Sequence, residues 1–274
     1  MNHFNPQPEI APKVLATDLD GTFIPLPRSA ANTTSLRIIS EHHLTDTFRL
    51  IFATGRHFES VLDAISEYNL PTPEWIICDV GSAIYKRHGD QFTHYTPYET
   101  HLLERSGQVN REEIEALLSQ LAGLELQSAD HQQRFKISYQ CAPELTDSFS
   151  QEIRKVLSAH SLPYDCLESI DPFENRGLID ILPAKVSKAY ALIWLATHAD
   201  FKPDEVIYSG DSGNDLAALI CGFRAIIVGN ASNALKAQVS DALSKRGLSD
   251  RLHIAAGEAT SGVLEGCQKF GLLS

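Results

Sequence analysis

The chain has 274 residues, of which 43% are hydrophobic, so it can bury a substantial core in one large domain or in two. Its formal net charge of −12 and its isoelectric point near 5.3 argue against nucleic acid as a partner, because a polyanion would be repelled. No apolar run approaches the roughly 20 residues that cross a bilayer, so we expect no membrane partner.

Residues 1–11 are rich in proline and polar side chains, and we expect them to form a loose tail. They lack the basic stretch followed by an apolar stretch that is typical of a secretory signal. The five cysteines are scattered singly, without the C-x-x-C pairs that are typical of zinc sites. We therefore expect reduced thiols in a cytoplasmic protein.

The first part of the chain alternates buried strands with a helix. "KVLATD", "RLIFATG" and "WIICDV" are short apolar runs with the length of buried strands. Between the last two, Phe58, Val61, Leu62 and Ile65 recur at helical spacing and predict a helix.

The middle of the chain has a different character. Asn110 and Glu113 form a capping-box pattern that predicts the start of a helix in "NREEIEALLSQLAGL". A strand in "RFKISYQ", a second helix in "DSFSQEIRKVLSAH" and an alternating stretch, "GLIDILP", follow. We therefore predict that residues 93–182 form a separate α+β domain inserted into the rest.

The last part of the chain returns to the first pattern. A helix in "PAKVSKAYALIWLATH" precedes "EVIYSGD", a helix-like "DLAALICGF", and then "RAIIVGN" and "RLHIAAG". Apolar runs of this length between helices are typical of parallel strands that are covered on both faces. We therefore predict a doubly wound α/β parallel sheet over residues 12–92 and 183–274.

Two groups of carboxylates follow predicted strands. The end of the first strand carries Asp18 and Asp20, and Gly21 follows them. A later strand end carries four polar residues: Asp211, Ser212, Asn214 and Asp215. Parallel sheets bind ligands at the carboxyl ends of their strands, and ligands that are all oxygen favour Mg²⁺ over zinc. The sequence therefore predicts a magnesium site.

A second set of residues is suited to an anion. Thr54, Gly55 and Arg56 follow the second predicted strand, and Lys188 lies in the first turn of a helix, where an ammonium and free amides can bind phosphate. We interpret the combination as phosphoryl transfer, in which one carboxylate attacks phosphorus and a second handles the proton. Lys185 is expected to be solvated. Arg56 either contacts substrate or pairs with an acidic neighbour.

Three other polar features have structural interpretations. Asp180 is expected to end a strand near a hinge rather than to bind a ligand. His42 and His43 are expected on a solvated face. Tyr190 and Trp194 recur at helical spacing and are expected to pack rather than to form a platform on which a sugar stacks, with both roles left open for Tyr190.

"DLDGT", "FATGR", a lysine at a helix start and "GDSGND" occur in the order of the four motifs of haloacid dehalogenase superfamily phosphatases, which the chain resembles. "VGSAIY", "FKISY", "DILPAKVSK" and "GVLEGCQKFGLL" are similar to segments of the sucrose-phosphate phosphatase family. The resemblance thus covers nearly the whole chain. It implies an enzyme that hydrolyses phosphoric monoesters of sugars, with the insertion as a cap that closes over the sugar.

The resemblance also implies roles for individual residues. Asp18 would form an aspartyl-phosphate, and Asp20 would protonate the leaving alcohol and then activate water. The residues implied to contact the phosphate are Gly21, Thr54, Gly55, Arg56, Lys188 and Asn214. The residues implied to bind or orient Mg²⁺ are Asp18, Asp20 through its carbonyl, Asp211 and Asp215.

The chain departs from the family pattern where the sugar would be expected. Ala83 stands where the family often has Glu, Cys141 and Ala142 stand where an acidic residue is usual, and Gly21 replaces the Asn or His of sucrose-specific members. A site that lacks a hydrogen-bond partner discriminates against ligands that need it. The sugar therefore stays open among sucrose 6-phosphate, other phosphorylated disaccharides and glycosyl-phosphoglycerates.

Two alternatives to a phosphatase stay open. A phosphotransferase resembling phosphomannomutase would return the phosphoryl group to its product instead of releasing it. A non-catalytic binding protein that retained the fold is disfavoured, because the residues implied to be catalytic are all present. For either enzyme the partner is a small phosphorylated sugar, and we expect a monomer, with a dimer as the alternative.

Overall fold

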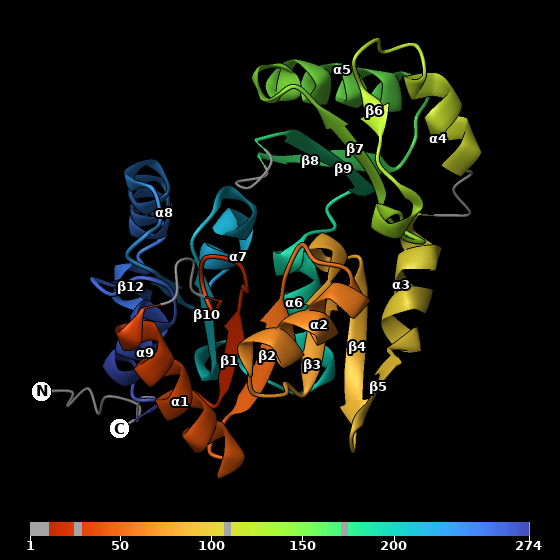
Figure 1. Cartoon of the computed structure of the whole chain (residues 1–274). Helices are drawn as coiled ribbons and strands as arrows, with labels where there is room; N and C mark the ends of the chain where they lie inside the picture. Colours follow the sequence, from red (N-terminus) through yellow and green to blue (C-terminus); the bar gives the residue numbers. More distant parts are fainter. Residues whose placement is uncertain (1–10, 25–28, 107–110, 171–174, 274) are drawn as a thin grey trace, which may run out of the picture. The chain divides into compact units, whose positions relative to one another are not determined.

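The computed structural model describes residues 11–24, 29–106, 111–170 and 175–273 (Figure 1). Its internal contacts divide the chain into two units. The first unit comprises residues 1–53, 63–74 and 193–274, and the second comprises residues 54–62 and 75–192. Nearly all of the predicted tail lies outside the described residues. The predicted boundaries of the inserted domain stay a prediction.

In its described residues, the first unit contains five parallel strands in the order β12-β11-β10-β1-β2. Their bounds are β1 Val14–Thr17, β2 Arg49–Ala53, β10 Val206–Gly210, β11 Arg224–Ile227 and β12 Leu252–Ile254. Every residue of β1, β10 and β11 is buried, as expected for strands covered on both faces. Thr17 lies opposite Ser209, so the chain leaves β1 and β10 at the same edge of the sheet.

Among the described residues, four α-helices belong wholly to the first unit. They are α1 Ala30–Leu44, α7 Leu216–Leu219, α8 Asn233–Lys245 and α9 Ala259–Lys269. Helices α2 Phe58–Tyr68 and α6 Lys188–His198 each run from one unit into the other. Helix α1 packs against α9, where Ser261 N donates to Asn32 Oδ1 at 2.9 Å. His43 on α1 is buried and its Nε2 lies 3.1 Å from Thr72 O, so the expectation of a solvated face is wrong for this residue.

Glu265 on α9 holds the loop that precedes the helix. Its carboxylate accepts from Ala256 N at 3.0 Å and from Gly257 N at 2.9 Å, and it lies 2.9 Å from His253 Nε2. Partial burial alone would raise the pKa of Glu265, but the two amides and His253 outweigh it and lower this pKa. The charged carboxylate therefore stabilises the fold at pH values above its ordinary pKa, and this contribution is lost as the pH falls through the lowered pKa.

Replacing Glu265 with Gln is expected to lower the free energy of unfolding at pH 7 by about 1 kcal/mol, because one acceptor oxygen becomes a donor. Urea denaturation at a series of pH values measures the difference, which should disappear as the pH falls through the lowered pKa of Glu265. The matched control is Glu258→Gln, an exposed position in the same loop, where a change of less than about 0.5 kcal/mol is expected. An effect of Glu265→Gln that persists in acid would contradict the explanation.

The second unit begins with antiparallel strands. Strand β3 Trp75–Cys78 pairs with β4 Ala83–His88, which pairs with β5 Gln91–His94, and α3 Thr96–Ser106 follows. A 3-10 turn at Asp79–Gly81 connects β3 to β4.

The rest of the second unit is a four-stranded antiparallel sheet in the order β6-β7-β9-β8, with two helices packed on it. The elements are α4 Arg111–Leu118, β6 Glu125–Leu126, β7 Ile137–Cys141, α5 Thr146–Ala159, β8 Tyr164–Ile170 and β9 Gly177–Pro183. The predicted strands "RFKISYQ" and "GLIDILP" are confirmed as β7 and β9. The predicted helix cap, Asn110, lies outside the described residues.

One core connects this sheet to its helices. Its fully or nearly fully buried members are Ile114, Leu118, Ile137, Tyr139, Cys141, Ile153, Leu157, Cys166, Ile179 and Ile181. Asp180 lies between the last two of these on β9 and accepts from Ser138 Oγ at 2.6 Å, so the expectation that it ends a strand is wrong.

The described residues contain no helix that is both long and apolar enough to cross a membrane. All five cysteines are free thiols, and all but Cys221 are buried.

Candidate active site

Three carboxylates of the first unit lie together at the carboxyl ends of β1 and β10. Asp18, Asp211 and Asp215 each offer an oxygen, and these oxygens all lie within 4.8 Å of one another. Asp18 and Asp215 are buried, and Asp211 is partly buried. Buried like charges at this spacing are unfavourable unless a cation offsets them. Because every donor in the cluster is a carboxylate oxygen, the cluster fits a hard divalent ion such as Mg²⁺.

The turn that follows β1 brings the chain against Asp211. Asp20 is partly buried in this turn, and the next residue, Gly21, has a φ of +75°. A Cβ on Gly21 would lie 2.6 Å from Asp211 Oδ2, so the Asp211 carboxylate would have to shift to admit it. Both the backbone conformation and the close approach therefore favour glycine here.

Two side chains orient Asp211. Thr22 Oγ1 donates to Asp211 Oδ1 at 2.9 Å, and Asn230 Nδ2 lies 3.4 Å from Asp211 Oδ2. Asn230 Nδ2 also donates to Gly21 O at 2.8 Å, and Asn230 Oδ1 accepts from Ala259 N at 2.8 Å. Neither Thr22 nor Asn230 was predicted to have a role at the site. The available signal for Asn230 was a polar residue shortly after the buried strand "RAII", the same signal that identified Asp18.

Asp215 is fully buried and fixes the loop that carries Asp211. Its Oδ1 accepts from Tyr208 Oη at 2.5 Å, and its Oδ2 accepts from the main-chain amides of Asp211 and Ser212, both at 3.1 Å. Burial, reinforced by the nearby carboxylates Asp215 and Asp18, raises the pKa of Tyr208 well above its ordinary value, so Tyr208 stays a donor. Asn214 in the same loop accepts from Ser212 Oγ at 3.1 Å.

A chain of buried hydroxyls holds the main chain of Asp18. Ser209 Oγ donates to Thr17 Oγ1 at 2.7 Å, and Thr17 Oγ1 donates to Asp18 O at 2.8 Å. Asp18 N donates to Ser209 O at 2.9 Å. Both main-chain polar groups of Asp18 are thus bonded to buried partners.

Of the residues predicted to contact phosphate, Gly21 and Asn214 belong to the first unit, and the others, Thr54, Gly55, Arg56 and Lys188, belong to the second. Thr54 is buried, and its Oγ1 accepts from Arg56 N at 3.2 Å. Arg56 Nη1 donates to Ser60 Oγ at 3.1 Å. Lys188 is the first residue of α6 and has no exposed area, whereas Lys185 is exposed as predicted. That these residues act together with the aspartates of the first unit stays a prediction.

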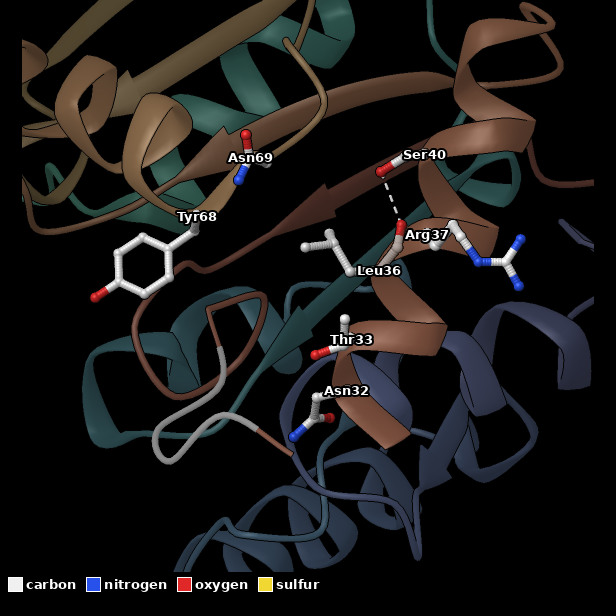
Figure 2. A pocket seen from close by; sticks show the side chains of 7 residues that line it. All are labelled: Asn32, Thr33, Leu36, Arg37, Ser40, Tyr68 and Asn69. Atoms are coloured by element: carbon white, nitrogen blue, oxygen red, sulfur yellow. Dashed lines mark hydrogen bonds between the residues drawn. The ribbon is translucent and has the colours of Figure 1, made fainter. Parts of the chain in front are cut away.

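The first unit also contains a cavity of about 390 Å³ (Figure 2). None of the predicted site residues is among the residues that line it. It is lined by Asn32, Thr33, Leu36, Arg37 and Ser40 of α1 and by Tyr68 and Asn69 at the end of α2. Several of the polar groups are bonded within α1: Ser40 Oγ donates to Leu36 O at 2.7 Å, and Arg37 pairs with Glu41 at 2.7 Å. The cavity therefore presents no cluster suited to catalysis.

The strand-end carboxylates and the α/β fold agree with the comparisons, which show that the chain is a phosphatase of the haloacid dehalogenase superfamily. A family model described as sucrose-6F-phosphate phosphohydrolase matches residues 11–271. The chain therefore belongs to that family, and it is a hydrolase acting on sugar phosphates.

Individual relatives agree with the family. The chain is 29% identical over 265 residues to mannosylfructose-phosphate phosphatase of Agrobacterium fabrum, with 95% of this chain and 97% of that protein covered. It is 32% identical over 228 residues to glucosylglycerol-phosphate synthase of Pseudomonas anguilliseptica, with 81% of this chain but only 27% of that protein covered. Its fold is similar to that of the sucrose-phosphatase from Synechocystis sp. PCC6803, solved with sucrose and phosphate, at a TM-score of 0.75 and 24% identity, with 97% of this chain and 100% of that chain covered.

Proposed function

We propose that this phosphatase depends on Mg²⁺ and removes the phosphate from a phosphorylated glycoside, that is, a sugar joined to a second sugar or a polyol. The support is chemical: the names of the family and of two relatives contain sucrose, mannosylfructose and glucosylglycerol phosphates, which are all glycosides that carry a phosphate. Sucrose 6-phosphate is one candidate among them.

The observation that carries the proposal is the group of carboxylate oxygens of Asp18, Asp211 and Asp215 within 4.8 Å of one another. In the proposed site, Asp18, Asp211 and the Asp20 carbonyl hold the ion, and Asp215 orients the loop of Asp211. Bound Mg²⁺ would supply positive charge that offsets the repulsion between a carboxylate and a phosphate.

The chain's own residues then carry the reaction. A carboxylate oxygen of Asp18 attacks phosphorus and forms an aspartyl-phosphate as the bond to the sugar oxygen breaks. Asp20 gives its proton to that oxygen, and the sugar leaves as an alcohol. Asp20 next takes a proton from water, which attacks the aspartyl-phosphate and releases inorganic phosphate. Asp18 is thereby restored.

The remaining proposed residues bind rather than react. Thr54 and the Gly55 amide hold phosphate oxygens, together with Lys188 at the start of α6. Arg56 and Asn214 also contact the phosphate. Their hydrogen bonds to Ser60 and Ser212 restrict the conformations of both side chains, which lowers the entropy lost when phosphate binds.

A phosphate-release screen tests the proposal. Purified protein is incubated with phosphorylated mono- and disaccharides and glycosyl polyol phosphates, with Mg²⁺ or with EDTA. We expect release from a phosphorylated glycoside, loss of release in EDTA, and recovery when Mg²⁺ is added in excess. No release from any member of the panel would contradict the proposal, as would an isomerised product formed without free phosphate.

A further inference from the structure

The 3-10 turn at Asp79–Gly81 has an unusual backbone. Asp79, Val80 and Gly81 are consecutive residues with φ values of 51°, 58° and 98°. A β-branched residue such as Val80 is strongly disfavoured at positive φ. Such a conformation persists only where surrounding contacts fix it, and it concentrates at functional sites. The contacts that hold the turn, and the residues that the turn positions, therefore need to be identified.

The turn touches both segments of the second unit that are proposed to hold phosphate. Asp79 N donates to Arg56 O at 2.9 Å, and Val80 N donates to Thr54 O at 3.1 Å. On the other side, Gly81 lies against the start of α6: a Cβ on Gly81 would overlap the Ser187 carbonyl oxygen and lie 2.9 Å from Lys188 N. The turn thus sets the spacing between residues 54–56 and Lys188.

Two side chains from other elements hold the turn. Lys136, just before β7, pairs with Asp79 at 3.0 Å, and the two side chains are only 6% and 3% exposed. Tyr98 on α3 donates to Gly81 O at 2.7 Å. Burial by itself would lower the pKa of Lys136, but Asp180 and Asp79 outweigh it and raise this pKa, so Lys136 stays charged. Removing one partner of a buried ion pair leaves the other charge without compensation.

We propose that Asp79 and Lys136 are positioning residues: their buried ion pair locks the Asp79–Gly81 turn, and the turn holds Thr54 and Lys188 at the spacing that phosphate binding needs. This inference rests on the proposed function, because it assumes that those two residues bind the phosphate group. It predicts that neutralising the ion pair weakens phosphate binding without weakening Mg²⁺ binding.

The test compares Asp79→Asn, Lys136→Met and Lys136→Arg with the unaltered chain, by calorimetric titration with inorganic phosphate and separately with Mg²⁺. Asn tolerates positive φ as Asp does, so Asp79→Asn removes the charge alone. For the two neutral variants we expect the Kd of phosphate to rise roughly tenfold or more, because small displacements of binding groups are costly. The Kd of Mg²⁺ should stay unchanged, and Lys136→Arg should restore phosphate binding.

The matched control is Glu74→Gln. Glu74 accepts from Leu50 N at 2.7 Å in the first unit, so the variant loses stability without touching the turn. Its phosphate Kd should not change. If a neutral variant of the ion pair does not fold, Tyr98→Phe takes its place, with an expected rise of roughly threefold from the lost hydrogen bond.

The outcomes separate this inference from the proposed function. Unchanged phosphate Kd values in the variants would overturn the positioning role and leave the phosphatase proposal standing. An unaltered chain that binds no phosphate would also overturn it. An unaltered chain that binds phosphate but releases none from the sugar-phosphate panel would overturn the proposed function, and the titrations would still decide whether the turn positions a phosphate site.

Discussion

Asp18→Asn is expected to lower phosphate release roughly a thousandfold or more while the fold stays intact. The substitution keeps the shape of the side chain and its main-chain bonds to Ser209 and Thr17, but a neutral amide oxygen is a poor nucleophile toward phosphorus. Steady-state phosphate release at saturating substrate measures the effect, and circular dichroism with thermal unfolding verifies the fold.

The matched control for this variant is Asp241→Asn. Asp241 is an exposed carboxylate on α8 that pairs with Lys245, so its loss should leave turnover within about twofold of the unaltered chain. If Asp18→Asn keeps a tenth or more of the original rate, another group performs the attack and the proposed mechanism is wrong.

Gly21→Ala is expected to weaken Mg²⁺ binding roughly tenfold to a hundredfold, because it displaces a carboxylate that is proposed to hold the ion. The new methyl group would have to occupy space 2.6 Å from Asp211 Oδ2, between that oxygen and the turn after β1. The positive φ adds a cost of roughly 1–2 kcal/mol in the free energy of unfolding. Calorimetric titration with Mg²⁺ and urea denaturation separate the two effects.

Gly271→Ala serves as the control, because Gly271 has nearly the same φ, +73°, and no atom within 4 Å of the added methyl group. It should lose stability by roughly 1–2 kcal/mol and keep its Mg²⁺ affinity. Equal losses of Mg²⁺ affinity in the two variants would mean that contact with Asp211 is not the cause.

Apolar runs made much of the fold predictable, but elements with few buried apolar residues were missed, α1 and β8 among them. Helix α1 buries Asn32, Ser35, Ile39 and His43 at helical spacing, but only one of these four is apolar, so hydrophobic periodicity does not reveal it. Strand β8 is an edge strand with a single buried residue, Cys166, and it leaves a similarly weak pattern.

Some residues of the candidate site were predictable from the sequence, and others were not. Asp18 and Asp211 were predictable because each follows a buried strand at the edge where parallel strands end. The contacts of Thr22 and Asn230 with Asp211 join residues 189 and 19 positions apart, and only the folded chain reveals such contacts. Asp is uncommon inside strands, so the sequence predicted that Asp180 ends one. In the structure, Ser138 on the paired strand donates a hydrogen bond to the Asp180 carboxylate within the sheet.

The hydroxyls behind Asp18 determine which atoms can move during turnover. Ser209 and Thr17 bind the peptide groups on both sides of this residue, so the backbone there is anchored and only the side-chain torsions are free. The phosphate ester must consequently approach a carboxylate whose main chain is fixed. Crystals soaked with vanadate or beryllium fluoride should therefore superpose on the ligand-free enzyme at the Cα atoms of residues 17–18, with any change confined to rotation about χ1 and χ2.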